Sequence, residues 1–379
     1  SGIEISHTVR EFSDIQKFLE TDLHAFTQFF ETRFVCGKKS VYTEWNKMLF
    51  NSMGESQRIG LLHEFMDDIK IRHKKYGNSP KVLEPNIKFT AGGLRDLHAV
   101  EWMYCLKNNL IISDQSERTQ TEIFLDILKN KMLINSLEVA RLKKSYELIL
   151  NVRNMLHLVC NKKNDRLEFP NQEKISKQMD EFSSNWQTFM KAYFEATSII
   201  NRFSITMVKR FEEQIQPPVS DRLAVVLDED YSLKGNLISV APNRELTFSS
   251  ILRAFYYRGL HSARFDEYLR SLIIEVIGEL EKSNEDVQSS SVFFREIVKL
   301  PKNVGTTLTR MNELGVLSRL LPEFNELVGF FQPGVYHCYT ADEHTLIAIN
   351  NLEKIAEDES TISKLFHGLR TKDMLFLAV

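Results

Sequence analysis

Five residues between Leu83 and His98 have types and a spacing that suit phosphate binding: Lys88, Gly92, Gly93, Arg95 and Asp96. Glycines let the backbone adopt positive φ and approach a ligand closely, and a helix that starts just after them would direct free N–H groups at an anion. Lys88 and Arg95 would then supply the cations. The same residues also suit an ordinary turn before a helix, in which Asp96 opposes the helix dipole and Arg95 forms a structural ion pair. Because no P-loop or dinucleotide fingerprint is matched, spacing alone favours the turn.

A second set of polar side chains, nearer the C-terminal end, could coordinate a divalent ion: His337, Asp342, Glu343 and His344. Imidazole and carboxylate groups are suitable ligands, but no further ligands follow at a known spacing, so packing roles are favoured. Two other sets have simpler explanations. The acidic run at 228–230 is predicted to lie in a hairpin turn, and His157, on one helix face with Arg153, is predicted to be a satisfied core residue.

The composition indicates a folded, mainly α-helical protein. Hydrophobic residues make up 43% of the 379 residues, and only 15 Gly and 9 Pro are available to interrupt helices. A net charge of −3 disfavours nucleic-acid binding. The four cysteines show no Cys-x-x-Cys spacing, which is typical of reduced thiols and not of disulfides or zinc sites. Neither a membrane span nor an export signal is indicated, so the chain is predicted to be cytoplasmic.

Hydrophobic periodicity predicts the order of the elements along the chain. Residues 1–10 alternate like a half-buried strand, and the absence of a nearby partner suggests the remnant of a sheet. A β-hairpin is predicted within 223–240, after a boundary at Pro217 and Pro218. Helices are predicted at 14–36, 40–75 with a break near 51–54, 97–108, 117–131, 136–161, 182–211 (an aromatic-lined core helix), 249–257, 265–281 and 292–298.

Four stretches together resemble one enzyme family. They read Leu-Glu-Pro-Asn-Ile-Lys at 83–88, Gly-Gly-Leu-Arg-Asp-Leu-His at 92–98, Arg-Met-Asn-Glu-Leu-Gly-Val-Leu at 310–317 and Tyr-His-Cys-Tyr-Thr-Ala-Asp-Glu-His-Thr-Leu at 336–346. The combination is similar to the bacterial bifunctional uridylyltransferase/uridylyl-removing enzymes that modify the PII nitrogen-signalling protein. The likeness extends over essentially the whole chain and includes Asn-Asp-Arg-Leu at 164–167.

The resemblance implies a mainly α fold made of the middle part of a longer enzyme. It predicts the last strand of a nucleotidyltransferase sheet, a helical bundle associated with uridylyl transfer, a short β-hairpin or linker, a helical linker domain and the opening helices of an HD phosphohydrolase domain. The corresponding ranges are 1–12, 13–216, 217–245, 246–330 and 331–379. The Gly-Ser turn and metal-binding aspartates of the transferase, and the His-Asp pair of the HD motif, are expected outside this chain.

The resemblance also implies a chemistry for the complete enzyme. UMP would pass from UTP to a tyrosine of a PII-like protein with the help of Mg²⁺, and the HD domain would remove it by hydrolysis. Lys88, Gly92, Gly93, Arg95 and Asp96 are similar to a loop that faces the nucleotide, and His344 to the first metal-binding His of the HD motif. With one ligand present, tight metal binding and independent activity of this chain are not expected. The alternatives are a non-catalytic helical interaction module and a related adenylyltransferase that modifies a protein.

Overall fold

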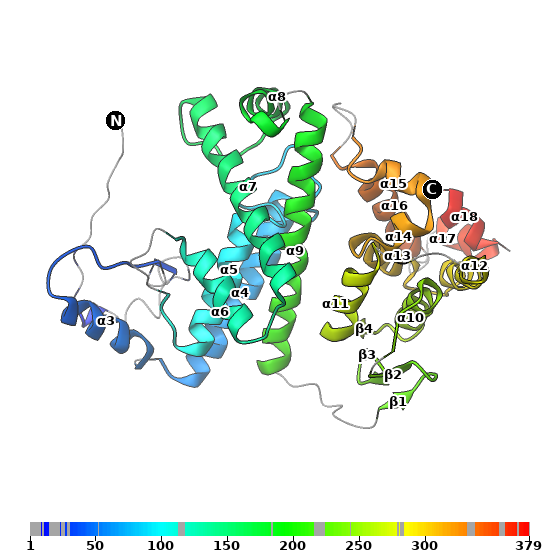
Figure 1. The fold of residues 1–379 in the computed structure, drawn as a ribbon, viewed down its shortest axis with the longest axis horizontal. Helices are drawn as coiled ribbons and strands as arrows, with labels where there is room; N and C mark the ends of the chain where they lie inside the picture. The colour runs from blue at the N-terminus through cyan, green and yellow to red at the C-terminus, as the bar shows by residue number, and fades with distance from the viewer. Residues whose placement is uncertain are drawn as a thin grey trace. The chain divides into compact units, whose positions relative to one another are not determined.

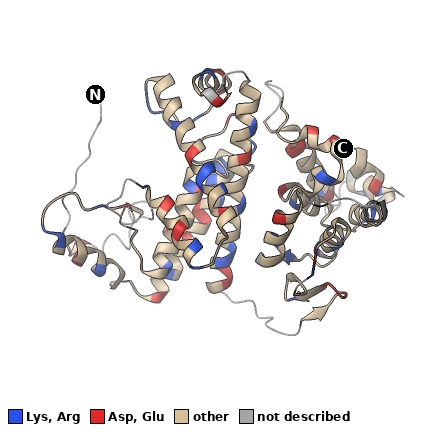
Figure 2. Cartoon of the chain, in the orientation of Figure 1, with Lys and Arg blue, Asp and Glu red and all other residues tan. Residues whose placement is uncertain are grey.

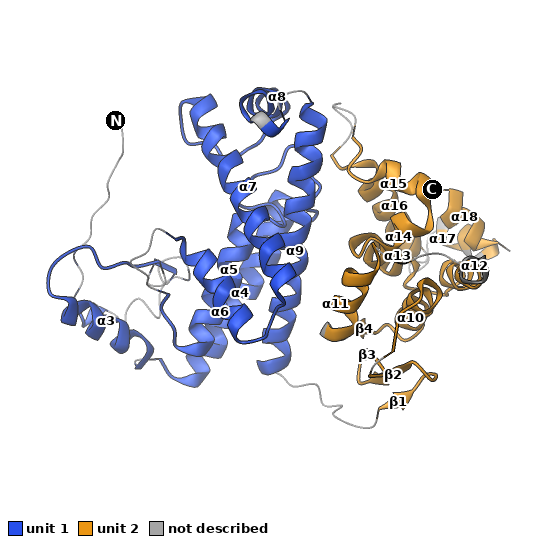
Figure 3. Ribbon diagram, in the orientation of Figure 1, with its two compact units in different colours: residues 1–216 blue, residues 217–379 orange. Residues whose placement is uncertain are grey.

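A computed structural model shows how the chain is arranged in two compact units, Ser1–Gln216 and Pro217–Val379 (Figure 3). It describes residues 9, 11–14, 23, 27–28, 31–51, 53–112, 118–182, 185–215, 224–242, 244–278, 280, 284–331, 338–355, 361–369 and 371–378. The predicted N-terminal strand, most of the predicted helix at 14–36, and the proline pair lie outside these residues. Within them, no helix combines the length and apolar character that crossing a membrane requires.

Unit 1 is a bundle of helices, which confirms the mainly α fold for this part of the chain (Figure 1). The predicted break near 51–54 is confirmed, because two separate helices flank it. The elements are α3 (Lys39–Asn51), α4 (Glu55–Tyr76), α5 (Leu94–Asn108), α6 (Gln120–Asn130), α7 (Ser136–Cys160), α8 (Phe169–Gln178), a short 3₁₀ turn (Asp180–Phe182) and α9 (Trp186–Ile215).

Helix α5 lies at the centre of unit 1, where it packs against α4, α6, α7 and α9. It begins at Leu94, one turn earlier than predicted, because Gly93 takes an extended conformation and serves as the N-cap. Most residues of the helix are buried, all round its axis, so its sequence has no single apolar face. Two carboxyl groups, those of Asp96 and Glu101, are buried with it.

The Glu101 carboxyl, 5% exposed, accepts a hydrogen bond from Thr121 Oγ1 at 3.0 Å. Burial raises its pKa from 4.5 to about 7. The folded protein therefore keeps a proton that the unfolded chain releases, and stability falls as the pH rises through this window. The free energy of unfolding of Glu101→Gln minus that of the native chain is the quantity to compare. We expect this difference to be about 2 kcal/mol larger at about pH 8 than at about pH 5, because only the native chain loses stability over that range.

Urea unfolding at the two pH values measures this difference. Glu147→Gln, which changes an exposed carboxyl on α7, is the matched control and should follow the native pH dependence. An identical pH dependence for Glu101→Gln and the native chain would contradict the prediction.

Helix α9 is the predicted aromatic-lined core helix, and this prediction is confirmed. Its buried side includes Phe189, Tyr193, Phe203 and Phe211. Thr197 lies on the same side, where its hydroxyl donates to the carbonyl of Pro80 at 2.8 Å. The backbone of α9 thereby comes close to the loop that precedes α5.

Unit 2 begins with a small sheet in the order β1 (Val225–Val226), β2 (Tyr231–Lys234), β3 (Leu237–Val240) and β4 (Arg264–Phe265). Antiparallel pairs join β1 to β2 and β2 to β3, and β4 runs parallel to β3. The predicted β-hairpin is confirmed in part: antiparallel strands form within 223–240, but Tyr231–Lys234 is a strand inside the predicted polar turn, so two hairpins follow each other. Gly235, with φ of 62°, supplies the tight turn between β2 and β3.

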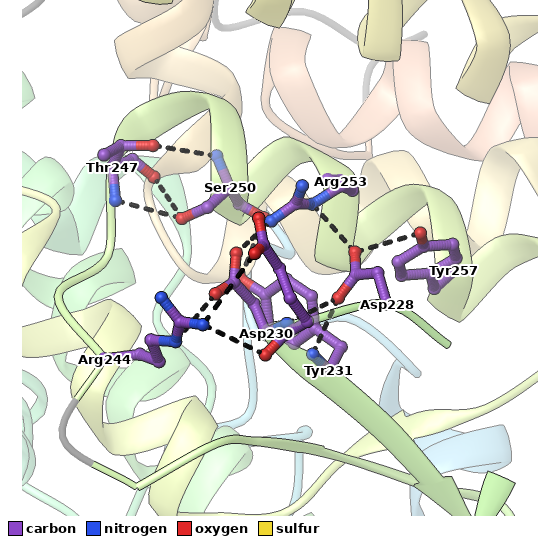
Figure 4. A network of polar contacts seen from close by, with 9 residues as sticks. Asp228, Asp230, Tyr231, Arg244, Thr247, Ser250, Arg253 and Tyr257 are labelled. Carbon is purple, nitrogen blue, oxygen red and sulfur yellow. Dashed lines mark hydrogen bonds and ion pairs between the residues drawn. The ribbon is translucent and has the colours of Figure 1, made fainter. Parts of the chain in front are cut away.

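The acidic run at 228–230 forms the turn between β1 and β2, and its carboxylates form ion pairs with arginines (Figure 4). Asp228 Oδ1 accepts from the N–H groups of Asp230 and Tyr231, both at 2.8 Å. Its Oδ2 lies 3.1 Å from Arg253 Nε, and Asp230 contacts both Arg253 and Arg244. These two aspartates have the Asp-x-Asp spacing, but here they form an ion-pair network that fixes the turn.

The rest of unit 2 is helical and shares one core with the sheet. Helix α16 is tied to the start of α13 by Glu353, whose carboxylate accepts from the N–H groups of Val304 at 2.7 Å and Gly305 at 2.8 Å. A carboxylate at a helix N-terminus offsets the helix dipole. The helices are α10 (Phe248–Leu260), α11 (Glu267–Val276), α12 (Asn284–Val298), α13 (Val304–Glu313), α14 (Val316–Leu320), α15 (Pro322–Leu327), α16 (Ala341–Ile355), α17 (Thr361–Gly368) and α18 (Lys372–Ala378).

Candidate functional site

The loop that joins α4 to α5 is anchored by an antiparallel pairing with the segment that follows α7. The N–H group of Ile87 donates to the carbonyl of Asp165 at 2.7 Å, and that of Leu167 donates to the carbonyl of Pro85 at 2.9 Å. The buried amide of Gln172, which follows this segment, also donates to the carbonyl of Leu83 at 2.7 Å and to that of Leu167 at 3.0 Å. Two segments far apart in sequence are thereby held side by side.

The glycine pair is required by close packing inside unit 1. Gly92 has φ of 77°, and a Cβ atom at this position would lie 2.0 Å from the carbonyl oxygen of Thr197 in α9. A Cβ atom on Gly93 would lie 2.7 Å from the carbonyl oxygen of Ile87. Both contacts are far shorter than van der Waals distances, so the structure accounts for both glycines without a ligand.

The backbone N–H groups at the start of α5 already have partners inside the protein. The Gly92 N–H donates to the Asp96 side chain at 2.7 Å. The N–H groups of the next three residues donate to backbone carbonyls: Gly93 to Thr90 at 2.8 Å, Leu94 to Ile87 at 3.2 Å and Arg95 to Lys88 at 3.0 Å. The expectation of free N–H groups facing an anion is therefore wrong. An anion bound next to this loop would have to be held by side chains.

Asp96 ties the end of α4 to the loop. Its carboxylate is fully buried and lies 2.6 Å from Arg72 Nη2 and 2.8 Å from His73 Nε2, while it accepts from the Gly92 N–H at 2.7 Å. Arg72, itself 5% exposed, also contacts Asp68 at 2.9 Å. Contact between Asp96 and a nucleotide would require these bonds to open, so the structure gives this residue a supporting role.

Lys88 and Arg95 are partly buried cations that rest on aromatic rings. The Lys88 ammonium lies 5.0 Å from the centroid of Phe89, and the Arg95 guanidinium lies 4.7 Å from that of Trp102. Among the described residues neither forms an ion pair, so the structural ion pair expected for Arg95 is absent there. Burial lowers the pKa of both groups, and the nearby Arg95 lowers that of Lys88 further.

A third cation, Arg153 on α7, lies close enough to depress the pKa of Lys88, after burial and Arg95. Its Nε is 2.7 Å from Asp165 Oδ1, and His157 Nε2 is 3.5 Å from the same oxygen. His157, predicted to be a core residue, is only partly buried. We call Lys88, Arg95 and Arg153 the cationic cluster. Sequence reasoning did not include Arg153 among the candidate site residues. The Asn-Asp-Arg-Leu pattern at 164–167 was a signal, because it contains Asp165, the partner of Arg153.

His98 shares a face of α5 with Arg95 and Trp102. Its ring centroid lies 6.0 Å from that of Trp102 and 6.3 Å from that of Tyr146 in α7. Burial first, and then the nearby Arg95 and Lys88, lowers its pKa to about 3, so the imidazole is neutral at neutral pH. Figure 2 shows blue Lys and Arg positions in the middle of unit 1, with red Asp and Glu positions among them. Neighbouring cations such as Lys88, Arg95 and Arg153 attract anions.

His344 lies in the first turn of α16 with its side chain exposed. The neighbouring Asp342 is fully buried and accepts from Thr340 Oγ1 at 2.7 Å, the Gly329 N–H at 3.1 Å and Asn312 Nδ2 at 3.0 Å. Asp342 is therefore committed to packing, while His337 lies outside the described residues.

Metal-ligand clusters are a further test of the site. In the part of the chain that the structure describes, no three His, Cys, Asp or Glu side chains come together in a way that could hold a metal ion. A magnesium site outside this chain stays a prediction.

Residues 62–208, which contain the whole cationic cluster, match the family model described as GlnD PII-uridylyltransferase. Three bifunctional uridylyltransferase/uridylyl-removing enzymes are similar to all of the chain. The protein from Pseudomonas aeruginosa (strain LESB58) is 26% identical over 397 residues, that from Haemophilus influenzae (strain 86-028NP) 25% over 393, and that from Ectopseudomonas mendocina (strain ymp) 28% over 395. The chain spans 42%, 44% and 42% of their respective lengths. No solved structure matches the chain.

Proposed function

We propose that the chain, which is similar over its whole length to bifunctional uridylyltransferase/uridylyl-removing enzymes, forms the helical part of a nucleotidyltransferase that moves UMP from UTP to a PII-like signalling protein. Its relatives are more than twice as long, so we assign the complete activity to a longer protein. In this proposal the transferase sheet precedes residue 13 and the HD domain begins at residue 331. We expect the protein to act in the cytoplasm.

The observation that carries the proposal is the cationic cluster next to the packed loop. Lys88 and Arg95 are preorganised on aromatic rings and form no ion pair among the described residues. In UMP transfer a tyrosine oxygen attacks the α-phosphate, the bond to the β-phosphate oxygen breaks, and pyrophosphate leaves with the added negative charge. Fixed cations stabilise this charge. Mg²⁺, held by aspartates of the longer protein, would supply further charge neutralisation.

The second activity in the relatives' name, removal of the uridylyl group, concerns unit 2. We propose that His344, exposed at the start of α16, is the first ligand of an HD-type hydrolase site whose other ligands belong to the longer protein. We expect this chain alone to have neither the hydrolase nor the transferase activity.

The test of the transferase proposal is Arg95→Ala in the longer protein. We expect it to reduce UMP transfer or UTP affinity about tenfold or more, because a preorganised cation at the phosphates is lost. The melting temperature should change little, since the cation–π contact with Trp102 is worth only about 1 kcal/mol. Steady-state kinetics with UTP and a PII-like protein measure the effect.

Arg118→Ala is the matched control, because this arginine is paired with Asp126 of α6. The substitution should leave the kinetics unchanged. A large loss of stability with native kinetics in Arg95→Ala would instead favour a purely structural turn. Transfer from ATP in place of UTP would indicate an adenylyltransferase. No transfer from either nucleotide would favour the non-catalytic helical module.

A further inference from the structure

Asp165 places a carboxylate beside the cationic cluster, in contact with Arg153. It lies 2.7 Å from Arg153 Nε, and it is close enough to Lys88 to raise the pKa of that ammonium against the opposing effects of burial and of Arg95. Of the three cations, only Arg153 forms an ion pair among the described residues, although Glu31 and Asp68 also raise the pKa of Arg95 against its burial. Arg72, by contrast, is matched by two carboxylates, those of Asp68 and Asp96.

The pairing between Arg153 and Asp165 uses only part of the guanidinium. The contact runs through Nε, and the structure gives the two Nη groups no other hydrogen-bond partner among the described residues. A guanidinium binds phosphate best through two parallel N–H groups. Arg153 is 24% exposed, so an anion can reach the groups that Asp165 leaves unused.

The Asp165 side chain can leave Arg153 without opening the loop. The backbone of Asp165 is fixed separately, by the bond from the Ile87 N–H to its carbonyl oxygen. The carboxylate can therefore rotate away while the antiparallel pairing stays intact. A carboxylate in this position occupies the place of an external anion.

We propose that Lys88, Arg95 and Arg153 bind a polyphosphate directly, without a metal ion, and that Asp165 is an internal competitor which the polyphosphate displaces from Arg153. The inference rests on the proposed function only in taking a nucleoside triphosphate as the natural source of the phosphates. The cations come from three places, the loop, α5 and α7, so they suit adjacent phosphates better than a single one. Three neighbouring cations, of which only Arg153 is ion-paired among the described residues, likewise favour an anion of high charge.

The test measures binding of inorganic triphosphate to this chain by calorimetry, at low salt and with EDTA present. We expect Arg153→Gln to weaken binding about tenfold, because a charge-assisted bidentate contact is lost. Asp165→Asn should strengthen binding by about tenfold, since it removes the competing negative charge and weakens the contact with Arg153. Arg118→Gln, which removes a cation paired with Asp126, should bind as the native chain does.

Asp165→Asn is the decisive variant, because a purely structural ion pair predicts no gain in affinity. The inference is overturned if the native chain does not bind triphosphate, or if a folded Asp165→Asn chain, verified by its melting curve, binds no more tightly. Equal affinity for inorganic phosphate and triphosphate would also overturn it. Equal affinity for UTP and triphosphate would support recognition through the phosphates alone, and tighter UTP binding that keeps both variant effects would support a nucleotide as the source.

The same variants separate this inference from the proposed function. Triphosphate binding with the expected variant effects, but no UMP transfer by the longer protein, would leave the inference standing and reject the transferase. If the longer protein transfers UMP and both Arg153→Gln and Asp165→Asn keep native rates and affinities, the inference is rejected and the proposed function stands.

Discussion

Replacing Gly92 by alanine is expected to lower the free energy of unfolding by about 3 kcal/mol or more. Two effects add. The backbone at this position has φ of 77°, which costs an alanine about 1–2 kcal/mol. The new methyl group would also lie 2.0 Å from the carbonyl oxygen of Thr197, and relieving such a collision costs about 1–3 kcal/mol. Chemical denaturation of the native and variant chains measures the loss.

Two other glycines separate these effects. Gly37 has φ of 103° but open space around a Cβ atom, so Gly37→Ala should show the backbone cost of about 1–2 kcal/mol alone. Gly60 lies within α4, also with open space, and Gly60→Ala should stabilise the chain by about 0.5–1 kcal/mol. If Gly92→Ala costs no more than Gly37→Ala, the close approach of α9 to the loop is not present in solution.

Asp96→Ala is expected to be equally damaging, with a loss of about 3–5 kcal/mol in the free energy of unfolding. The substitution leaves Arg72, only 5% exposed, without one of its two carboxylates, and it leaves the buried Gly92 N–H without its acceptor. An unpaired buried charge and an unsatisfied buried donor are both costly. Urea unfolding followed by circular dichroism measures the change.

Asp68→Ala is the matched control, because Asp68 is the other carboxylate on Arg72 but is 27% exposed and one helical turn away in α4. Its loss should cost about 0.5–1 kcal/mol. Asp96→Asn, which can still accept from the Gly92 N–H, should fall between the two alanine variants. Equal effects of Asp68→Ala and Asp96→Ala would show that the buried position of Asp96 has no special weight.

The sequence by itself predicted most helices of unit 1, because helix formation and burial leave a local three- to four-residue periodicity that can be read directly. The break before α4, the long aromatic helix α9 and the prominence of the Gly92–Gly93 pair follow from such local patterns. The small sheet was predicted less well. The strand at Tyr231–Lys234 is four residues long and lies beside an acidic turn, so its periodicity was hidden.

The tertiary structure decided what the residues around the glycines do. Pairing between residues 85–87 and 165–167 brings Asp165 and Arg153 to Lys88, and no pattern within either segment encodes that meeting. Burial in the middle of the bundle committed Asp96 to Arg72. The sequence determined which side chains with suitable chemistry are present and which helices carry them. Only long-range packing decided which of them share one space, because a local pattern carries no information about partners that are distant along the chain.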